Sequence, residues 1–107
     1  MPGVPTRKQL KAAMLAIFLE KEPKAKTLRS KEFTRLLFSY AKALKGIDSE
    51  REISSFQMES VGLFGNYLLR KQAEKSKRSA KSAGRIFREI VDESDELFDE
   101  IESRAQG

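Results

Sequence analysis

Apolar residues recur at intervals of three and four along nearly the whole chain, and no stretch shows the alternation that predicts a β-strand. This spacing places the apolar side chains of each segment on one face of an α-helix. We therefore predict an all-α fold with one helical domain over residues 1–107, in which residues 1–5 are a short flexible N-terminus. The expected fold is a small bundle of four to five helices, at about residues 6–21, 30–45, 49–64, 67–82 and 84–103.

Short sequence signals predict where the first three helices begin and end. Pro23 predicts the end of the first helix, because proline cannot continue one, and residues 24–27 then form a short basic connection. Gly46 is a typical residue just after a helix C-terminus. Ser49 and Glu52 match a capping box, in which each side chain accepts a hydrogen bond from the backbone amide of the other residue. The third helix is therefore expected to begin at residue 49.

The later boundaries depend on glycines. Gly62 and Gly65 each destabilise a helix interior by up to ~1 kcal/mol relative to alanine, which favours a break near residues 65–66. Residues 67–82 and 84–103 could still join into one long helix. A division near Gly84 is favoured, because an undivided helix would place lysines in its first half and acids in its second, against its own macrodipole.

The chain contains no cysteine, histidine or tryptophan. It must therefore fold without disulfides, and it lacks the side chains most used in acid–base catalysis and metal binding. No zinc-binding spacing, phosphate-binding glycine loop or nucleophile motif is present. These absences predict a non-enzymatic protein with no cofactor, no metal and no small-molecule substrate.

An apolar run spans residues 12–19, and charged residues follow it at positions 20–22. A membrane-spanning helix needs about 18 or more apolar residues. The run also lacks the small-residue cleavage site of a secretory signal. We therefore expect it to be a helix of a mature cytoplasmic protein that does not enter a membrane.

Charge is distributed unevenly along the chain. The formal net charge is +5, but residues 1–88 hold 20 basic and 8 acidic residues, whereas residues 89–107 hold 1 basic and 8 acidic residues. Within residues 70–88, helical spacing gathers the cations in an arc of about 160°, with small and apolar residues such as Leu69 and Ala73 behind them. This pattern predicts a row of outward-facing cations that is braced by a neighbouring helix.

A row of cations that rises ~1.5 Å per residue can follow a nucleic-acid backbone and release its condensed counterions. We therefore expect the protein to bind the phosphates of DNA or RNA, largely independently of sequence, and to act in multiple copies. The predicted contact residues are Arg70, Lys71, Lys75, Lys77, Arg78, Lys81, Arg85 and Arg88, with a possible extension of the track to Lys24, Lys26 and Arg29.

The alternative function is that of a protein–protein adaptor or assembly subunit, in a homo-oligomer or a larger complex. Phe38 lies off the apolar stripe of its helix, about 140° from Phe33. It is expected to fill a subunit interface or to stack on a base. Acidic residues near the C-terminus are expected to dock on the basic segment of a neighbouring copy, or to fold back on that of their own chain. The interface candidates in this acidic segment are Asp92, Asp95, Glu96 and Asp99.

Overall fold

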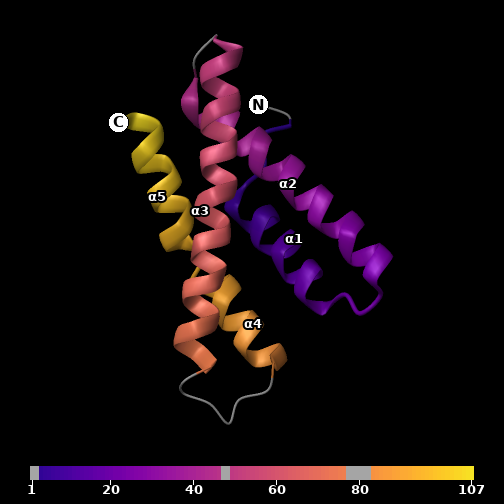
Figure 1. The fold of residues 1–107 in the computed structure, drawn as a ribbon. Helices are drawn as coiled ribbons and strands as arrows, with labels where there is room; N and C mark the ends of the chain where they lie inside the picture. The colour runs from indigo at the N-terminus through magenta and orange to yellow at the C-terminus, as the bar shows by residue number, and fades with distance from the viewer. Residues whose placement is uncertain (1–2, 47–48, 77–82) are drawn as a thin grey trace.

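The computed structural model describes residues 3–46, 49–76 and 83–107, and these residues form five α-helices and no strand (Figure 1). The prediction of an all-α fold is confirmed. The helices are α1 (Arg7–Leu19), α2 (Pro23–Lys45), α3 (Glu50–Ser76), α4 (Ala83–Asp92) and α5 (Asp95–Gln106). The end of the predicted fourth helix, residues 77–82, lies outside the described residues.

The long helix α3 is the column against which the other helices are arranged. α1 and α2 pair as a hairpin, in which α2 also packs on α3 and α1 also packs on α4. After α3 the chain reverses, so that α4 lies along the C-terminal half of α3 and α5 lies farther up the same column (Figure 1). The acidic C-terminal segment therefore packs against the helices that precede it in its own chain.

The core is built from apolar side chains of all five helices. Its members include Leu10 of α1, Leu37 of α2, Phe56 of α3, Ile90 of α4 and Ile101 of α5, each at most 4% exposed. These residues lie on the apolar faces that the helical spacing predicts. Their burial is the main driving force for folding in a chain without disulfides.

Two aromatic pairs join helices that are distant in sequence. Phe18 of α1 stacks on Phe87 of α4, with ring centroids 4.6 Å apart. Phe33 of α2 meets Phe64 of α3 at 4.5 Å in a tilted arrangement. Pairs at these distances contribute about 0.5–1.5 kcal/mol beyond their area burial.

Capping signals place the starts of α1 and α3 close to the predicted positions. The Thr6 hydroxyl accepts a hydrogen bond from the Gln9 amide at 3.2 Å, and Gln9 Oε1 accepts one from the Thr6 amide at 2.8 Å. At α3, the Glu52 amide donates to Ser49 Oγ at 3.4 Å. Pro5, immediately before the first cap, is buried, so the fold holds this residue of the segment predicted to be flexible.

The predicted role of Pro23 is wrong. This residue is the first of α2, so residues 24–27 belong to the helix and are not a connection. Proline is tolerated at the first helical position, because its fixed φ suits a helix and its missing amide would have no partner there. The real connection is shorter, and the Glu20 carboxylate closes it by accepting from the amides of Lys21 and Glu22, each at 3.1 Å.

The predicted break near residues 65–66 is also wrong, because α3 continues through Gly62 and Gly65. Neither glycine faces the core, and a Cβ built on either one would meet nothing within 4 Å. The opposite side of the helix is anchored by buried Ser60 and Tyr67. This tertiary packing outweighs the ~1 kcal/mol that each glycine costs.

The C-terminal segment agrees with the favoured division and differs from the prediction in one way. α3 and α4 are separate helices that pack on each other, so residues 67–103 do not form one long helix. The predicted helix 84–103 is bent where α4 meets α5, at residues 93–94. Ser94 is fully buried at this bend, and its hydroxyl donates to the Val91 carbonyl. The bend lets both halves of the segment follow α3.

Candidate nucleic-acid interface

Two cations in the C-terminal half of α3, Lys71 and Lys75, point inward, toward the acidic helices. The side chain of Lys71 is only 10% exposed, and its Nζ forms ion pairs with Glu96 and, at 3.3 Å, with Glu93. Lys75 Nζ lies 2.9 Å from Glu93 and 3.4 Å from Glu89. We call these five residues the Lys71 cluster. It ties α3 to α4 and α5.

The electrostatics of the Lys71 cluster favour the charged form of each group whose pKa is shifted. The hydrogen bond with Glu96 raises the pKa of Lys71, and the one with Glu93 raises the pKa of Lys75. The same contact with Lys75 holds the pKa of the Glu93 carboxyl below its usual range. Lys71, Lys75 and Glu93 therefore remain ionised over the whole neutral range.

The orientation predicted for this part of α3 is the reverse of the one observed. Leu69, expected on the packed side, is 69% exposed, and Ala73 is exposed as well. Lys71 and Lys75, expected to face outward, are the inward residues. The prediction failed because a helical wheel does not show that acidic residues about 20 positions later supply partners for buried cations.

A second cluster joins α1 to α5. Arg7 forms ion pairs with Asp95 at 3.1 Å, Asp99 at 2.8 Å and Glu102 at 2.9 Å. Lys11 Nζ lies 2.7 Å from Asp95. We call these five residues the Arg7 cluster. The acidic segment thus folds back on its own chain, which is one of the two arrangements expected for it.

The Arg7 cluster also reaches α2 through a tyrosine. The Tyr40 hydroxyl donates to Glu102 Oε1 at 2.8 Å. Burial and this carboxylate raise the pKa of Tyr40 to about 12. The pKa of Glu102 is lowered by Tyr40 and Arg7, and that of Asp95 by Lys11 and Arg7. Burial opposes the charge on Arg7, but its hydrogen bonds to these acids outweigh that effect and raise its pKa.

The other predicted contact residues have varied positions. Arg70 is exposed and lies 3.9 Å from Glu74. Arg85 and Arg88 are exposed on α4, and Asp92 is exposed at its end. Lys77, Arg78 and Lys81 lie outside the described residues.

Helix α2 carries cations with far less compensation. Seven of its 23 residues are basic, and Glu32, paired with Arg29 at 3.3 Å, is its only acidic residue. Helical spacing of ~100° per residue places four exposed cations within about 60° of Phe38. We call these residues and Phe38 the α2 face: Lys24, Lys31, Arg35, Phe38 and Lys42.

The cations of the α2 face have no acidic partner among the residues that the structure describes. None of the four forms an ion pair with another residue in the part of the chain that the structure describes. Lys45, farther along α2, lies 5.5 Å from the ring of Phe56. Sequence reasoning included Lys24 only as an extension of the track and missed Lys31, Arg35 and Lys42 as contact residues. The signal that could have found them is the excess of six positive charges within one helix.

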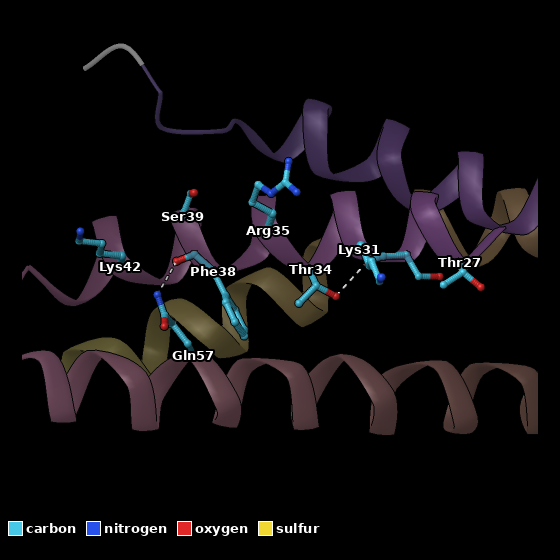
Figure 2. A pocket seen from close by; sticks show the side chains of 9 residues that line it. Thr27, Lys31, Thr34, Arg35, Phe38, Ser39, Lys42 and Gln57 are labelled. Carbon is cyan, nitrogen blue, oxygen red and sulfur yellow. Dashed lines mark hydrogen bonds between the residues drawn. The ribbon is translucent and has the colours of Figure 1, made fainter. Parts of the chain in front are cut away.

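A groove lies beside the α2 face, between α2 and α3 (Figure 2). Its volume is about 530 Å³, and Phe38 is partly buried with its ring pointing toward α3. Gln57 of α3 donates from Nε2 to the Phe38 carbonyl at 3.3 Å, which links the two helices at the groove. We call this cavity the Phe38 groove, lined by Thr27, Ser30, Lys31, Thr34, Arg35, Phe38, Ser39, Lys42 and Gln57.

Several of the hydroxyl groups that line the Phe38 groove are used within the helix. Thr34 Oγ1 donates to the Ser30 carbonyl at 2.9 Å, and Thr27 Oγ1 donates to the Pro23 carbonyl at 3.0 Å. The aromatic ring and aliphatic groups therefore dominate the floor. Lys31, Arg35 and Lys42 also line the groove, and none of its lining residues is acidic. The groove thus combines an apolar surface with positive charge.

Comparisons of the chain with family models, with curated proteins and with solved structures gave no match. Among the described residues, no helix is long and apolar enough to cross a membrane. Within residues 3–46, 49–76 and 83–107, no group of three or more acidic side chains is placed to hold a metal ion.

Proposed function

We propose that the protein binds nucleic acid through the α2 face, by contacts to phosphates that are largely independent of sequence. The observation that carries this proposal is a set of four exposed cations on one side of α2 that form no ion pair with any described residue. The cations of the Lys71 and Arg7 clusters are neutralised within the fold. We therefore assign the phosphate contacts to the α2 face, and no longer to Lys71 and Lys75 as the sequence predicted.

The dimensions of the α2 face suit a polyanion. Lys24 and Lys42 are 18 residues apart, which is about 27 Å along a helix. A stacked strand places one phosphate every ~3.4 Å, so this length matches about eight nucleotides. Four neutralised phosphates predict that log affinity falls with log salt concentration with a slope of about −3.

The test is a salt titration of binding to a labelled oligonucleotide, using a charge-reversed variant with Lys31→Glu, Arg35→Glu and Lys42→Glu. We expect this variant to lose binding at the salt concentration where the parent binds. The salt dependence of the variant's remaining binding is then measured at lower salt. If its slope is more than half of the parent's slope, the proposal is wrong.

A matched control keeps the same net charge and changes three exposed cations elsewhere. Lys8→Glu, Lys21→Glu and Arg51→Glu together reverse three such charges that form no ion pair among the described residues. Binding by this control should stay within a few-fold of the parent. An equal loss in both variants would show that net charge alone, rather than the α2 face, causes binding.

A second candidate function, an assembly subunit, is favoured by the solvent-facing side of α3. This side carries one charged residue among eleven, in a chain in which 35% of residues are charged. Met58 and Leu69 on it are 64% and 69% exposed. We call it the α3 outer face: Arg51, Ser54, Ser55, Met58, Gly62, Gly65, Asn66, Leu69, Gln72, Ala73 and Ser76.

The occupant that fits the α3 outer face best is a second copy of the same helix. In an antiparallel pair centred midway between Gly62 and Gly65, each of these glycines meets the other glycine of the second copy. The same register places Met58 beside the second copy's Leu69, so small residues meet where the helices cross and large apolar residues meet on either side. Close approach of the two backbones would also explain why glycine occurs in an exposed helix interior.

Sedimentation equilibrium tests this assembly. Met58→Glu and Leu69→Glu should each shift the protein toward monomer, because they bury a charge at the contact. Leu28→Glu, a change at a similarly exposed leucine on α2, should not. A parent protein that is monomeric at all concentrations would refute the second candidate.

A further inference from the structure

We infer that the Phe38 groove receives an unpaired base of a single-stranded nucleic acid, with Phe38 as the stacking surface. This inference rests on the proposed function and extends it to the kind of strand that is bound. The groove adds an apolar surface around Phe38 to the α2 face, and phosphate binding alone does not require such a surface.

The position of the Phe38 ring sets it apart from the other aromatic residues of α2. Phe38 is partly buried, whereas the other aromatic residues of α2, Phe33 and Tyr40, are at most 6% exposed and belong to the core. Its ring enters the space between α2 and α3 and leaves a cavity of about 530 Å³ beside it (Figure 2). This volume lies within the ~300–1,000 Å³ range of pockets that bind small molecules.

The charge around the Phe38 ring is positive. Lys31, Arg35 and Lys42 line the groove together with Phe38, and no acidic residue does. A ligand that places a flat apolar group on the floor must therefore carry negative charge beside it. Nucleotides in a strand meet both requirements, because each flat base is attached to a backbone phosphate.

The position of the ring inside the groove distinguishes single strands from duplexes. Bases in a duplex are stacked on both sides and paired at their edges, so they cannot reach a ring inside a groove without leaving the helix. A single strand can turn one base inward while its phosphates follow the rim. The hydrogen bond from Gln57 to the Phe38 carbonyl holds α2 and α3 together at the groove, so the site exists before the base enters.

A tryptophan at position 38 gives a direct measurement, because the natural chain contains no tryptophan. Phe38→Trp should keep the stacking surface and should lose fluorescence when a 12-nucleotide oligo(dT) or oligo(U) binds. Leu19→Trp, at an exposed position at the end of α1 and outside both the α2 face and the α3 outer face, is the control and should keep its fluorescence. The two oligonucleotides compare DNA with RNA.

Affinity measurements supply the second readout. Phe38→Leu keeps an apolar side chain and removes the aromatic face, so it should weaken single-strand binding about tenfold. Its affinity for a 12-base-pair duplex should change less than twofold, and Phe38→Trp should restore single-strand binding. Circular dichroism establishes that each variant is folded.

The outcomes separate this inference from the proposed function. Unquenched fluorescence of Phe38→Trp in a protein that binds oligonucleotides through its α2 cations would overturn the inference and leave the proposed function standing. Equal losses for single strands and duplexes in Phe38→Leu would do the same. If the parent binds neither kind of oligonucleotide at low salt, both proposals are wrong.

Discussion

Replacing Lys71 with alanine should lower the free energy of unfolding by about 2 kcal/mol. A hydrogen bond between charged groups contributes about 1.5–3 kcal/mol, and Lys71 has ion pairs with both Glu93 and Glu96. These carboxylates are 45% exposed, so solvent screening reduces the contribution of each pair. Loss of the packed aliphatic stem, whose side chain is only 10% exposed, adds to the cost.

Thermal unfolding followed by circular dichroism measures this effect. With an unfolding entropy of ~2.1 cal/mol/K per residue, a loss of 2 kcal/mol lowers the melting temperature by about 9 °C in a chain of 107 residues. The matched control is Arg70→Ala, since Arg70 is 52% exposed and its nearest carboxylate, on Glu74, is 3.9 Å away. This change should cost less than about 0.5 kcal/mol.

A double-mutant cycle identifies the source of the loss. Lys71→Ala and Glu96→Gln should show a coupling of about 0.5–2 kcal/mol, because they remove the same contact. If Lys71→Ala costs no more than Arg70→Ala, Lys71 is a solvated surface residue and the observed orientation of α3 is contradicted. Oligonucleotide affinity of the folded Lys71→Ala variant should equal that of the parent.

Three further predictions concern stability. Phe33→Ala, which removes a ring that is 1% exposed, should cost about 3–5 kcal/mol in urea unfolding; a cost below 1 kcal/mol would contradict its place in the core. Gly62→Ala should raise the stability of the monomer by about 0.5–1 kcal/mol, because the added Cβ meets open space and alanine favours the helix, and a decrease in the melting temperature would refute this. The folded-state pKa values of Glu93, Asp95 and Glu102 are lowered, so the unfolded chain binds protons more readily and stability should fall as the pH drops below about 4.5, the ordinary value for a glutamate; a pH titration of the melting temperature that stays flat down to pH 3 would contradict these pairings.

The positions of the helices could be predicted from the sequence because apolar periodicity is a property of each segment alone. The start of α3 followed in the same way from the local capping residues Ser49 and Glu52. Pro23 could not be assigned with equal certainty, since proline is compatible both with the residues after a helix and with its first turn. The length of the connection between α1 and α2 decides between these positions, and that length depends on how the two helices pack.

The direction in which charged side chains point could not be predicted from one helix. On a helical wheel, Lys71 belongs to the same arc as Arg70, yet one is buried and the other exposed. The difference comes from Glu93 and Glu96, which approach only because the chain reverses after α3 and bends at Ser94. A buried lysine is stable only beside such partners, so its orientation is a property of the tertiary fold.

The pairing of opposite charges within the fold bears on how copies of the protein can assemble. Six of the eight acidic residues after Arg88 form ion pairs with cations of α1 or α3: Glu89, Glu93, Asp95, Glu96, Asp99 and Glu102. Head-to-tail docking of this segment on the basic segment of a neighbouring copy would have to break these pairs and replace them with equivalent ones, which gives little net gain in free energy. The α3 outer face, which carries a single charge, meets no such competition from the residues that the structure describes, and neither do the cations of the α2 face. Contacts with another copy and with a polyanion are therefore expected on different helices, so that a protein assembled through α3 would still present its α2 face to a strand.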